Sequence, residues 1–227
     1  MTEKEIKFFD TNIDRKSSIS DKNLVFFKDT NIPMPSVIEI SNSGMCNRKC
    51  SFCPRSDPNY DHVNEFIDQN LHDKIYDELK SFNYSGSIIY SGFVEPLLDK
   101  RIYKHIKDIR EKLPNVNLEI ITNGDPLNDK RALKLFEAGI SVLLISVYDG
   151  PKEAESFLKM MKRINIDKSR YVIRNRYYGE DKDFGITLSN RAGNLNNAEF
   201  KIEPLKESLK MKCTYPSYTF FIDYNGD

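Results

Sequence analysis

Three cysteines lie within a few residues of one another in the segment Cys46-Asn-Arg-Lys-Cys50-Ser-Phe-Cys53, with the spacing C-x-x-x-C-x-x-C. Three thiolates on one short loop are able to hold three irons of a cubic iron–sulfur cluster, and the fourth iron then has no protein ligand. An iron with an open position binds a small molecule and acts on it, whereas a cluster with four cysteine ligands transfers electrons. The motif therefore predicts chemistry at a metal centre.

Two other interpretations of these cysteines are open from the residues themselves: a structural zinc site and unrelated thiols. A structural zinc site uses four ligands, commonly as two separated pairs; the sequence has no second pair, and the nearest extra ligand is His62. Arg48 and Lys49 lie beside the cysteines and are expected to favour the thiolate form. His72 and His105 belong to no motif and are expected at the surface of helices. An iron–sulfur cluster is the preferred prediction, and a non-catalytic, metal-stabilised binding module is the alternative.

The composition is that of a globular protein with a substantial core, with 39% hydrophobic and 30% charged residues in a chain of 227. Lys+Arg and Asp+Glu both number 34, so the formal net charge is zero, and neither nucleic acid nor an anionic membrane is expected as a partner. The longest strongly apolar run, Ile140–Tyr148, is far shorter than the ~20 residues that span a bilayer. The first residues do not follow the pattern of a signal peptide, and the cysteines do not resemble a disulfide framework. A cytoplasmic location is expected.

Hydrophobic periodicity predicts short strands that alternate with helices. Runs rich in β-branched residues predict strands at 36–41, 87–91, 116–122, 141–147 and 170–174. Apolar spacing near 3.6 residues predicts helices at 65–81, 99–112, 130–138 and 151–163. The strands recur at about the 30-residue spacing of βαβ units, and their apolar character suits a parallel sheet that is buried on both faces. The predicted fold class is α/β.

Four segments that suit a binding site follow the predicted strands directly. They are the cysteine loop and residues 91–96, 122–124 and 146–150. In sheets of this kind, ligands bind beyond the carboxyl ends of the strands. The four segments are therefore expected to share one site.

The pattern divides the chain into three parts. Residues 1–35 are a polar lead-in, residues 36–180 carry the alternation of strands and helices, and residues 181–227 form an incomplete extension. Within the extension, residues 201–227 predict a hairpin whose turn, Asn225-Gly226, comes at the end of the chain. The chain is expected to be a fragment of a longer protein. A third hypothesis is that this fragment is non-functional, with an open barrel and an exposed apolar edge.

The cysteine loop resembles the signature of the radical S-adenosylmethionine (SAM) enzymes, because an aromatic residue, Phe52, directly precedes the last cysteine. The resemblance covers roughly residues 36–180. It implies a partial (β/α)6 TIM-like barrel with mostly parallel strands and a 4Fe-4S cluster held by Cys46, Cys50 and Cys53 in the loop after the first strand. It also implies that the open iron binds SAM, and that reduction cleaves SAM to methionine and a 5′-deoxyadenosyl radical, which abstracts hydrogen from a substrate.

Other segments are similar to the SAM-binding segments of this family. Residues 91–96, Ser-Gly-Phe-Val-Glu-Pro, are similar to its Gly-Gly-Glu-Pro-type motif, although valine stands where related sequences often have glycine. Glycine at such a position allows the backbone to approach a ligand closely. The resemblance places residues 122–123 along SAM, residue 146 near the ribose and residue 174 near the carboxylate. The cofactor-binding residues that it implies are Gly92, Val94, Glu95, Pro96, Thr122, Asn123, Ser146 and Arg174.

These positions also have structural interpretations. Glu95 would suit the start of a helix, where the helix dipole favours an acid. Asn123 would suit an ordinary turn. Ser146 would suit a buried serine that bonds to the backbone, and Arg174 a surface or ion-paired arginine.

The C-terminal part resembles the start of a SPASM or twitch extension, which binds auxiliary iron–sulfur clusters. The similar residues are Leu-Ser-Asn-Arg-Ala-Gly-Asn at 188–194, Cys213 and residues 221–227. One thiolate does not hold a cluster, so an auxiliary cluster that uses Cys213 is expected only in a longer full-length protein. The resemblance further implies a low-potential electron donor such as flavodoxin or ferredoxin. The implied substrate is a peptide, a sugar or an aminocyclitol, which would undergo oxidation or maturation chemistry.

Overall fold

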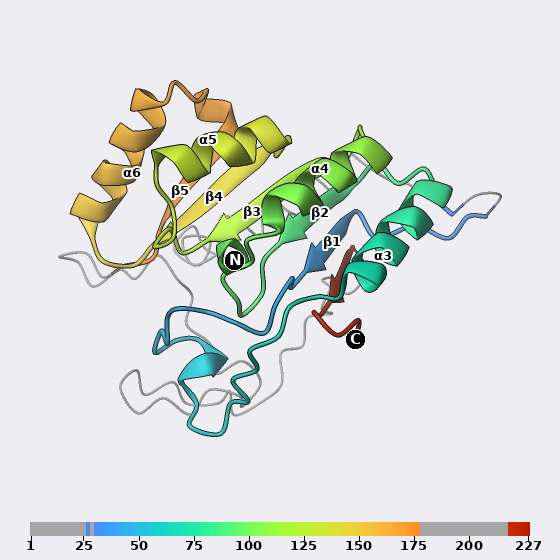
Figure 1. Cartoon of the computed structure of the whole chain (residues 1–227), viewed down its shortest axis with the longest axis horizontal. Coiled ribbons are helices and arrows are strands. Elements are labelled where there is room, and N and C mark those ends of the chain that lie inside the picture. Colours follow the sequence, from blue (N-terminus) through green and yellow to red (C-terminus); the bar gives the residue numbers. More distant parts are fainter. Residues whose placement is uncertain (1–25, 28–29, 178–217) are drawn as a thin grey trace, which may run out of the picture.

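The computed structural model describes residues 26–27, 30–177 and 218–227, and these residues form an α/β fold around one six-stranded sheet (Figure 1). Every strand pairing in the sheet is parallel, and the strand order is β5-β4-β3-β2-β1-β6. The strands are β1 (Val37–Ile40), β2 (Ser87–Tyr90), β3 (Asn117–Thr122), β4 (Val142–Val147), β5 (Tyr171–Asn175) and β6 (Thr219–Ile222). The predicted α/β class and the mostly parallel, TIM-like partial barrel are confirmed.

In the described part of the chain, four α-helices connect the strands and lie on one side of the sheet (Figure 1). They are α3 (Gln69–Ser81), α4 (Ile102–Lys112), α5 (Asp129–Ala138) and α6 (Pro151–Arg163), and short 3-10 helices lie at η1 (Pro54–Ser56), η2 (Pro96–Leu98) and η3 (Lys168–Arg170). Local chemistry sets their ends. The carboxylate of Asp68 accepts hydrogen bonds from two backbone amides of the first turn of α3, and the side chain of Asn128 does the same for one amide of α5. Gly139, with φ of 113°, ends α5 in the left-handed conformation that glycine favours.

The hydrophobic core lies between the sheet and these helices. Alternate residues of the inner strands point to this side; Ile40, Ile88 and Leu118 are fully buried there with Ile106 of α4. Burial of each such side chain contributes about 1.5–3 kcal/mol to folding. The opposite face of the sheet is more polar, because it carries Glu39 of β1 and Glu119 of β3. Both glutamates are in register with Ile89 of β2, so they lie on the same face. The helices of the described residues lie on the other, apolar face (Figure 1).

The predicted strands and helices are present, with shifts of a few residues at their ends. The helix predicted at 65–81 begins at Gln69, because Phe66 forms a β-bridge with Ser43 and Asp68 caps the first turn. The helix predicted at 99–112 begins at Ile102, because η2 and a turn at Asp99 come first.

The hairpin predicted at 201–227 stays a prediction, because the structure describes only residues 218–227 of that range. Residues Thr219–Ile222 form β6, which pairs in parallel with β1 and so extends the main sheet. Phe220 and Phe221 on this edge strand are exposed. The remaining residues of the extension, including Cys213, and most of the lead-in at 1–35 lie outside the described residues, so the division into three parts stays a prediction.

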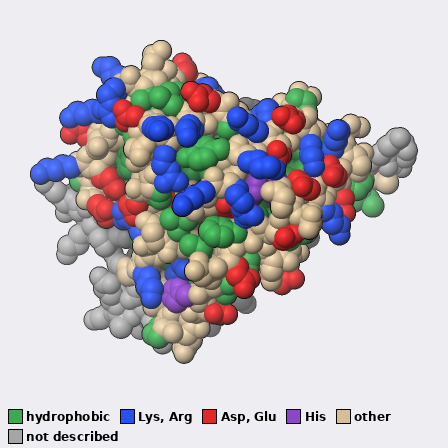
Figure 2. Space-filling view, in the orientation of Figure 1, with side chains coloured by type: hydrophobic (Ala, Val, Ile, Leu, Met, Phe, Trp, Pro, Cys, Tyr) green, Lys and Arg blue, Asp and Glu red, His purple; other side chains and the backbone are tan. Residues whose placement is uncertain are grey.

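Within the described part of the chain, none of the helices combines the length and apolarity that a membrane crossing requires. Figure 2 shows that basic and acidic side chains are interspersed over the helix-covered face. This face therefore presents no field of a single sign.

Candidate functional site

A pocket lies at the carboxyl ends of the strands. Its lining comes from the cysteine loop and from the segments that follow or end β2, β3, β4 and β5. The lining residues are Cys46, Arg48, Cys50, Phe52, Cys53, Ser91, Gly92, Phe93, Val94, Glu95, Ile121, Thr122, Asn123, Ser146, Tyr148 and Arg174. The structure thus brings together the three cysteines and every predicted cofactor-binding residue except Pro96.

Pro96 lies just behind the pocket. It is buried at the start of η2, and its carbonyl oxygen accepts a hydrogen bond from Asn42 Nδ2 at 3.1 Å. Its observed contact joins the β2 loop to the end of β1, which is a structural role.

The three cysteines are half-buried and form no disulfide. Burial raises the pKa of the Cys46 thiol, and burial together with the neighbouring Cys53 raises the pKa of Cys50 to about 11. Arg48 lowers the pKa of Cys50 by a smaller amount, so the predicted preference for thiolate does not arise from the protein alone. A bound cation would supply the missing stabilisation, because metal binding displaces the thiol protons.

The spacing of the cysteine sulfur atoms bears on whether they could bind a single metal ion. Among the described residues, the sets of three ligand atoms that lie within 4.8 Å of one another are His72–Asp73–Asp108 and Asp125–Asp149–Glu153, so the three cysteine sulfurs form no such set. Tetrahedral zinc with Zn–S bonds of about 2.3 Å would require sulfurs about 3.8 Å apart. The three cysteine thiols would therefore have to move closer together to bind a single tetrahedral zinc ion.

Arg48 connects the cysteine loop to the ends of two strands. Its guanidinium donates hydrogen bonds to Asp125, which follows β3, and to both carboxylate oxygens of Asp149, which follows β4, at 3.0 and 2.7 Å. Glu153 of α6 lies 3.7 Å away. Only 18% of the Arg48 side chain is exposed, and these carboxylates raise its pKa far above the ordinary value of arginine. Arg48 therefore fixes the position of the loop on the barrel.

Glu95 joins three segments at the centre of the site. Its carboxylate accepts hydrogen bonds from Thr122 Oγ1 at 2.7 Å, from the Asn123 amide at 2.7 Å and from the Leu97 amide at 3.0 Å. Its own amide donates to the Met45 carbonyl at 2.8 Å, directly before the first cysteine. Burial raises the pKa of Glu95 to about 7. The binding and the structural interpretation of Glu95 each describe part of what is seen, because Glu95 lines the pocket and also caps η2.

Glycine is required at two positions of the pocket rim. Gly92 has φ of 107°, and a Cβ atom there would lie 2.2 Å from Ser41 Oγ. Gly124 has φ of 83°, and a Cβ atom there would lie 2.4 Å from the Phe157 ring. Val94, between Gly92 and Glu95, is half-buried and faces the pocket. The backbone at 92–95 therefore reaches the pocket despite the valine.

The β4–β5 side of the pocket is built from Ser146, Arg174 and Tyr148. Arg174 Nη2 donates to Ser146 Oγ at 2.9 Å, which excludes the interpretation of Arg174 as a purely surface residue. The ring of Tyr148 lies 5.5 Å from the ring of Phe52, and the Arg48 guanidinium lies 5.3 Å from the Tyr148 ring. The aromatic pair covers the cysteine loop from the side of β4.

Two residues of the site were not predicted from the sequence, Tyr148 and Arg55. Arg55 is 4% exposed, and its Nη1 donates to the carbonyls of Gly44 at 2.9 Å and Phe93 at 3.3 Å, so it joins the cysteine loop to the β2 loop. Its position two residues after Cys53 carries no sequence signal for this contact. Tyr148 does carry one, because it directly follows a strand whose carboxyl end faces the site.

The comparisons with known proteins agree with this geometry. The sequence profile of the Radical SAM superfamily matches residues 40–176, which is more than half of the chain. The chain is 31% identical over 183 residues to the S-adenosyl-L-methionine-dependent 2-deoxy-scyllo-inosamine dehydrogenase of Niallia circulans, and the match covers 80% of this chain and 67% of that relative.

Two solved structures have a similar fold. The crystal structure of BtrN in complex with AdoMet and 2-DOIA superposes with a TM-score of 0.66 and 28% identity, over 84% of this chain and 70% of BtrN. A structure of BtrN in an open conformation superposes with a TM-score of 0.56 and 24% identity, over 84% of this chain and 66% of that one, and supports the fold. The family profile, the identity to the dehydrogenase and the shared fold lead to one conclusion: this chain belongs to the radical SAM superfamily of enzymes.

Proposed function

We propose that this protein is a radical SAM dehydrogenase that oxidises a hydroxyl group of an aminocyclitol. The observation that carries the proposal is the pocket, in which three thiols with room for a cluster face the residues that end β2, β3, β4 and β5. The substrate class is supported by the 31% identity to a 2-deoxy-scyllo-inosamine dehydrogenase. The peptide and sugar substrates considered from the sequence have no such support.

Within this proposal each part of the pocket has a role. Cys46, Cys50 and Cys53 would hold a 4Fe-4S cluster, which, when bound and reduced, supplies the electron that cleaves SAM to methionine and a 5′-deoxyadenosyl radical. The backbone at 92–95 and the segment at 122–123 would orient the methionine part of SAM. Ser146 and Arg174, which share a hydrogen bond of 2.9 Å, would contact its polar groups.

The polar face of the sheet supports a cationic, hydroxyl-rich substrate. Glu39 accepts a hydrogen bond from Ser91 Oγ at 2.5 Å, and Ser91 lines the pocket. Glu119, on the same face, accepts from Asn117 Nδ2 at 2.8 Å and is fully buried. Carboxylates on this face of the sheet would favour an ammonium group over an anion.

Oxidation of an alcohol to a ketone removes two hydrogens from the substrate. The 5′-deoxyadenosyl radical takes one as a hydrogen atom, and the substrate then loses a proton and an electron. The electron requires an acceptor, for which we propose an auxiliary iron–sulfur cluster in a longer protein or an external carrier. Flavodoxin or ferredoxin is the proposed source of the first electron. Cys213, the proposed auxiliary ligand, lies outside the described residues.

The test is a turnover assay. The protein is loaded with iron and sulfide without oxygen, reduced with dithionite, and incubated with SAM and either 2-deoxy-scyllo-inosamine or a cysteine-containing peptide. The proposal predicts 5′-deoxyadenosine with both, and one equivalent of ketone for each 5′-deoxyadenosine only with the aminocyclitol. Equal amounts of 5′-deoxyadenosine without any ketone would refute the substrate class. No 5′-deoxyadenosine from the cluster-loaded protein would refute the chemistry.

A further inference from the structure

Two histidines on the helix-covered side of the sheet are buried, contrary to the surface position expected from their helices. His72 of α3 and His105 of α4 are both 0% exposed, and their rings stack with centroids 4.0 Å apart. They face inward because α3 and α4 pack side by side over β1 and β2 (Figure 1). The site is distinct from the pocket, which lies at the carboxyl ends of the strands.

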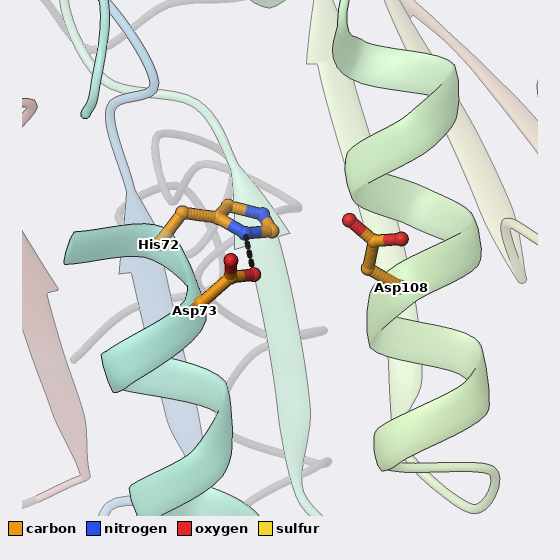
Figure 3. A group of neighbouring side chains, drawn as sticks. All are labelled: His72, Asp73 and Asp108. Atoms are coloured by element: carbon orange, nitrogen blue, oxygen red, sulfur yellow. Dashed lines mark ion pairs between the residues drawn. The ribbon is translucent and has the colours of Figure 1, made fainter. Parts of the chain in front are cut away.

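His72 points toward two carboxylates, one from each helix. Figure 3 shows the His72 ring beside the carboxylate of Asp73, the next residue of α3, with Asp108 of α4 across from them. His72 Nδ1 lies 3.6 Å from Asp73 Oδ1, and ligand atoms of all three residues lie within 4.8 Å of one another. Asp73 and Asp108 are 42% and 24% exposed, so an ion would reach the group from solvent.

The other ring nitrogen of His72 is held by tyrosines. His72 Nε2 lies 3.1 Å from the Tyr90 hydroxyl, which lies 3.1 Å from the Tyr76 hydroxyl, and both tyrosines are fully buried. This contact fixes the ring so that Nδ1 faces the carboxylates. A hydrogen bond from the second nitrogen is the arrangement that orients histidines bound to metals.

Buried polar atoms in proteins nearly always have a hydrogen-bond partner. Among the described residues, His72 Nδ1 has none, because its distance of 3.6 Å to Asp73 is too long. Both ring nitrogens of His105, stacked against His72, also have none. A buried ring nitrogen that makes no hydrogen bond and lies beside two carboxylates is a feature that a cation would satisfy.

We propose that His72, Asp73 and Asp108 form a binding site for a divalent transition-metal ion such as Zn²⁺, which would join α3 to α4. One imidazole nitrogen and two carboxylate oxygens form a ligand set that zinc accepts, with bonds of about 2.0–2.2 Å. The absence of thiolate from this set separates it from the cysteine site, whose soft ligands select iron–sulfur clusters. Water would complete the coordination from the exposed side.

Nearby lysines leave carboxylate oxygens of Asp73 and Asp108 available to a metal ion. Lys104 lies 2.6 Å from Asp108 Oδ2, which leaves the other carboxylate oxygen for a metal, and Lys104 is 60% exposed. Lys112 lies 2.7 Å from Asp77 but 3.8 Å from Asp73, so its closer partner is Asp77. Gln69 Nε2 donates to Asp73 Oδ1 at 3.1 Å and would fix that carboxylate.

The test is equilibrium dialysis of the full chain against Zn²⁺, after its cysteines have been loaded with the iron–sulfur cluster. Asp108→Asn removes a ligand at a partly exposed position, and Asp77→Asn is the matched control, since Asp77 lies one turn from Asp73 and is 64% exposed. His72→Gln is the second ligand variant. Zinc that binds to residual thiols contributes equally to every variant and cancels in the comparison.

The proposal predicts that the wild-type and Asp77→Asn chains bind one Zn²⁺ more than Asp108→Asn, or bind it at least about tenfold more tightly, a difference of about 1.4 kcal/mol. It also predicts that Zn²⁺ raises the melting temperature of the first two chains and leaves that of Asp108→Asn unchanged, because a ligand that binds only the folded state stabilises it. Equal zinc binding by wild type and Asp108→Asn would overturn the proposal, even if His72→Gln failed to fold.

Discussion

The cysteine loop and the sheet behind it are held in shape by opposite kinds of contact. The sheet depends on alternating apolar residues, such as Ile40 and Ile88, that are buried against the helices. The loop between β1 and α3 contains only the short helix η1, and long-range polar contacts hold it: Arg48 to the β3 and β4 ends, Arg55 to the β2 loop, and Met45 to Glu95. The scaffold thus follows from local patterning, while the site depends on a small number of polar side chains.

The largest expected effect comes from the loop's own ligands. Cys50→Ala removes one of three thiols, and two thiols do not hold a cubic cluster, so cluster absorbance and SAM cleavage should both be lost. The measurement is the visible absorbance of the cluster together with 5′-deoxyadenosine formation after anaerobic loading. Cys213→Ala is the control, because it removes a cysteine outside the loop and should keep both signals. SAM cleavage by Cys50→Ala would contradict the assignment.

The next effect concerns Glu95, which links the loop to β2 and β3. Its folded pKa of about 7 lies above the ordinary value of 4.5, so the folded state binds the proton more tightly. The contribution of Glu95 to stability is therefore full below pH 4.5 and is lost as the pH rises to about 7, a change of about 3 kcal/mol.

Glu95→Gln does not titrate, and it also replaces one acceptor oxygen by a donor. The unfolding free energy of the wild type should thus fall by about 3 kcal/mol relative to that of Glu95→Gln between pH 4.5 and 8. Urea unfolding of the metal-free chain at several pH values measures it. The comparison with the variant cancels the titration of the histidines. A difference that stays constant with pH would show that folding does not raise the pKa of Glu95.

Arg48 tests whether polar contacts hold the loop. Arg48→Met should destabilise the chain by about 2 kcal/mol, because it removes charged hydrogen bonds from a group that is 18% exposed. Arg163→Met is the control; Arg163 also makes two hydrogen bonds to one aspartate, Asp129, but it is 61% exposed, and its removal should destabilise the chain much less. Equal losses in thermal unfolding would mean that Arg48 is only a surface ion pair.

Val94 gives the smallest expected effect. Val94→Gly removes a side chain that faces the pocket and should tighten SAM binding by less than about tenfold. Calorimetric titration of the cluster-loaded protein with SAM measures the change. Unchanged affinity would show that the pocket accommodates valine.

The same contrast explains which features could be predicted from the sequence. The strands and helices followed from periodicity, and the parallel order then placed the three cysteines beside Thr122, Asn123 and Ser146. The burial of His72 could not be predicted, because it depends on how α3 meets α4. The position of β6 at the edge of the sheet could not be predicted for the same reason, since its pairing with β1 joins strands far apart in the sequence.

The central claim is that the pocket holds a cluster with one iron open to SAM. The most direct measurement is the electron paramagnetic resonance spectrum of the reduced, reconstituted protein with and without SAM. The account predicts the signal of a reduced cubic cluster that changes when SAM is added. A cluster signal that is indifferent to SAM, or bound zinc in place of iron, would contradict it.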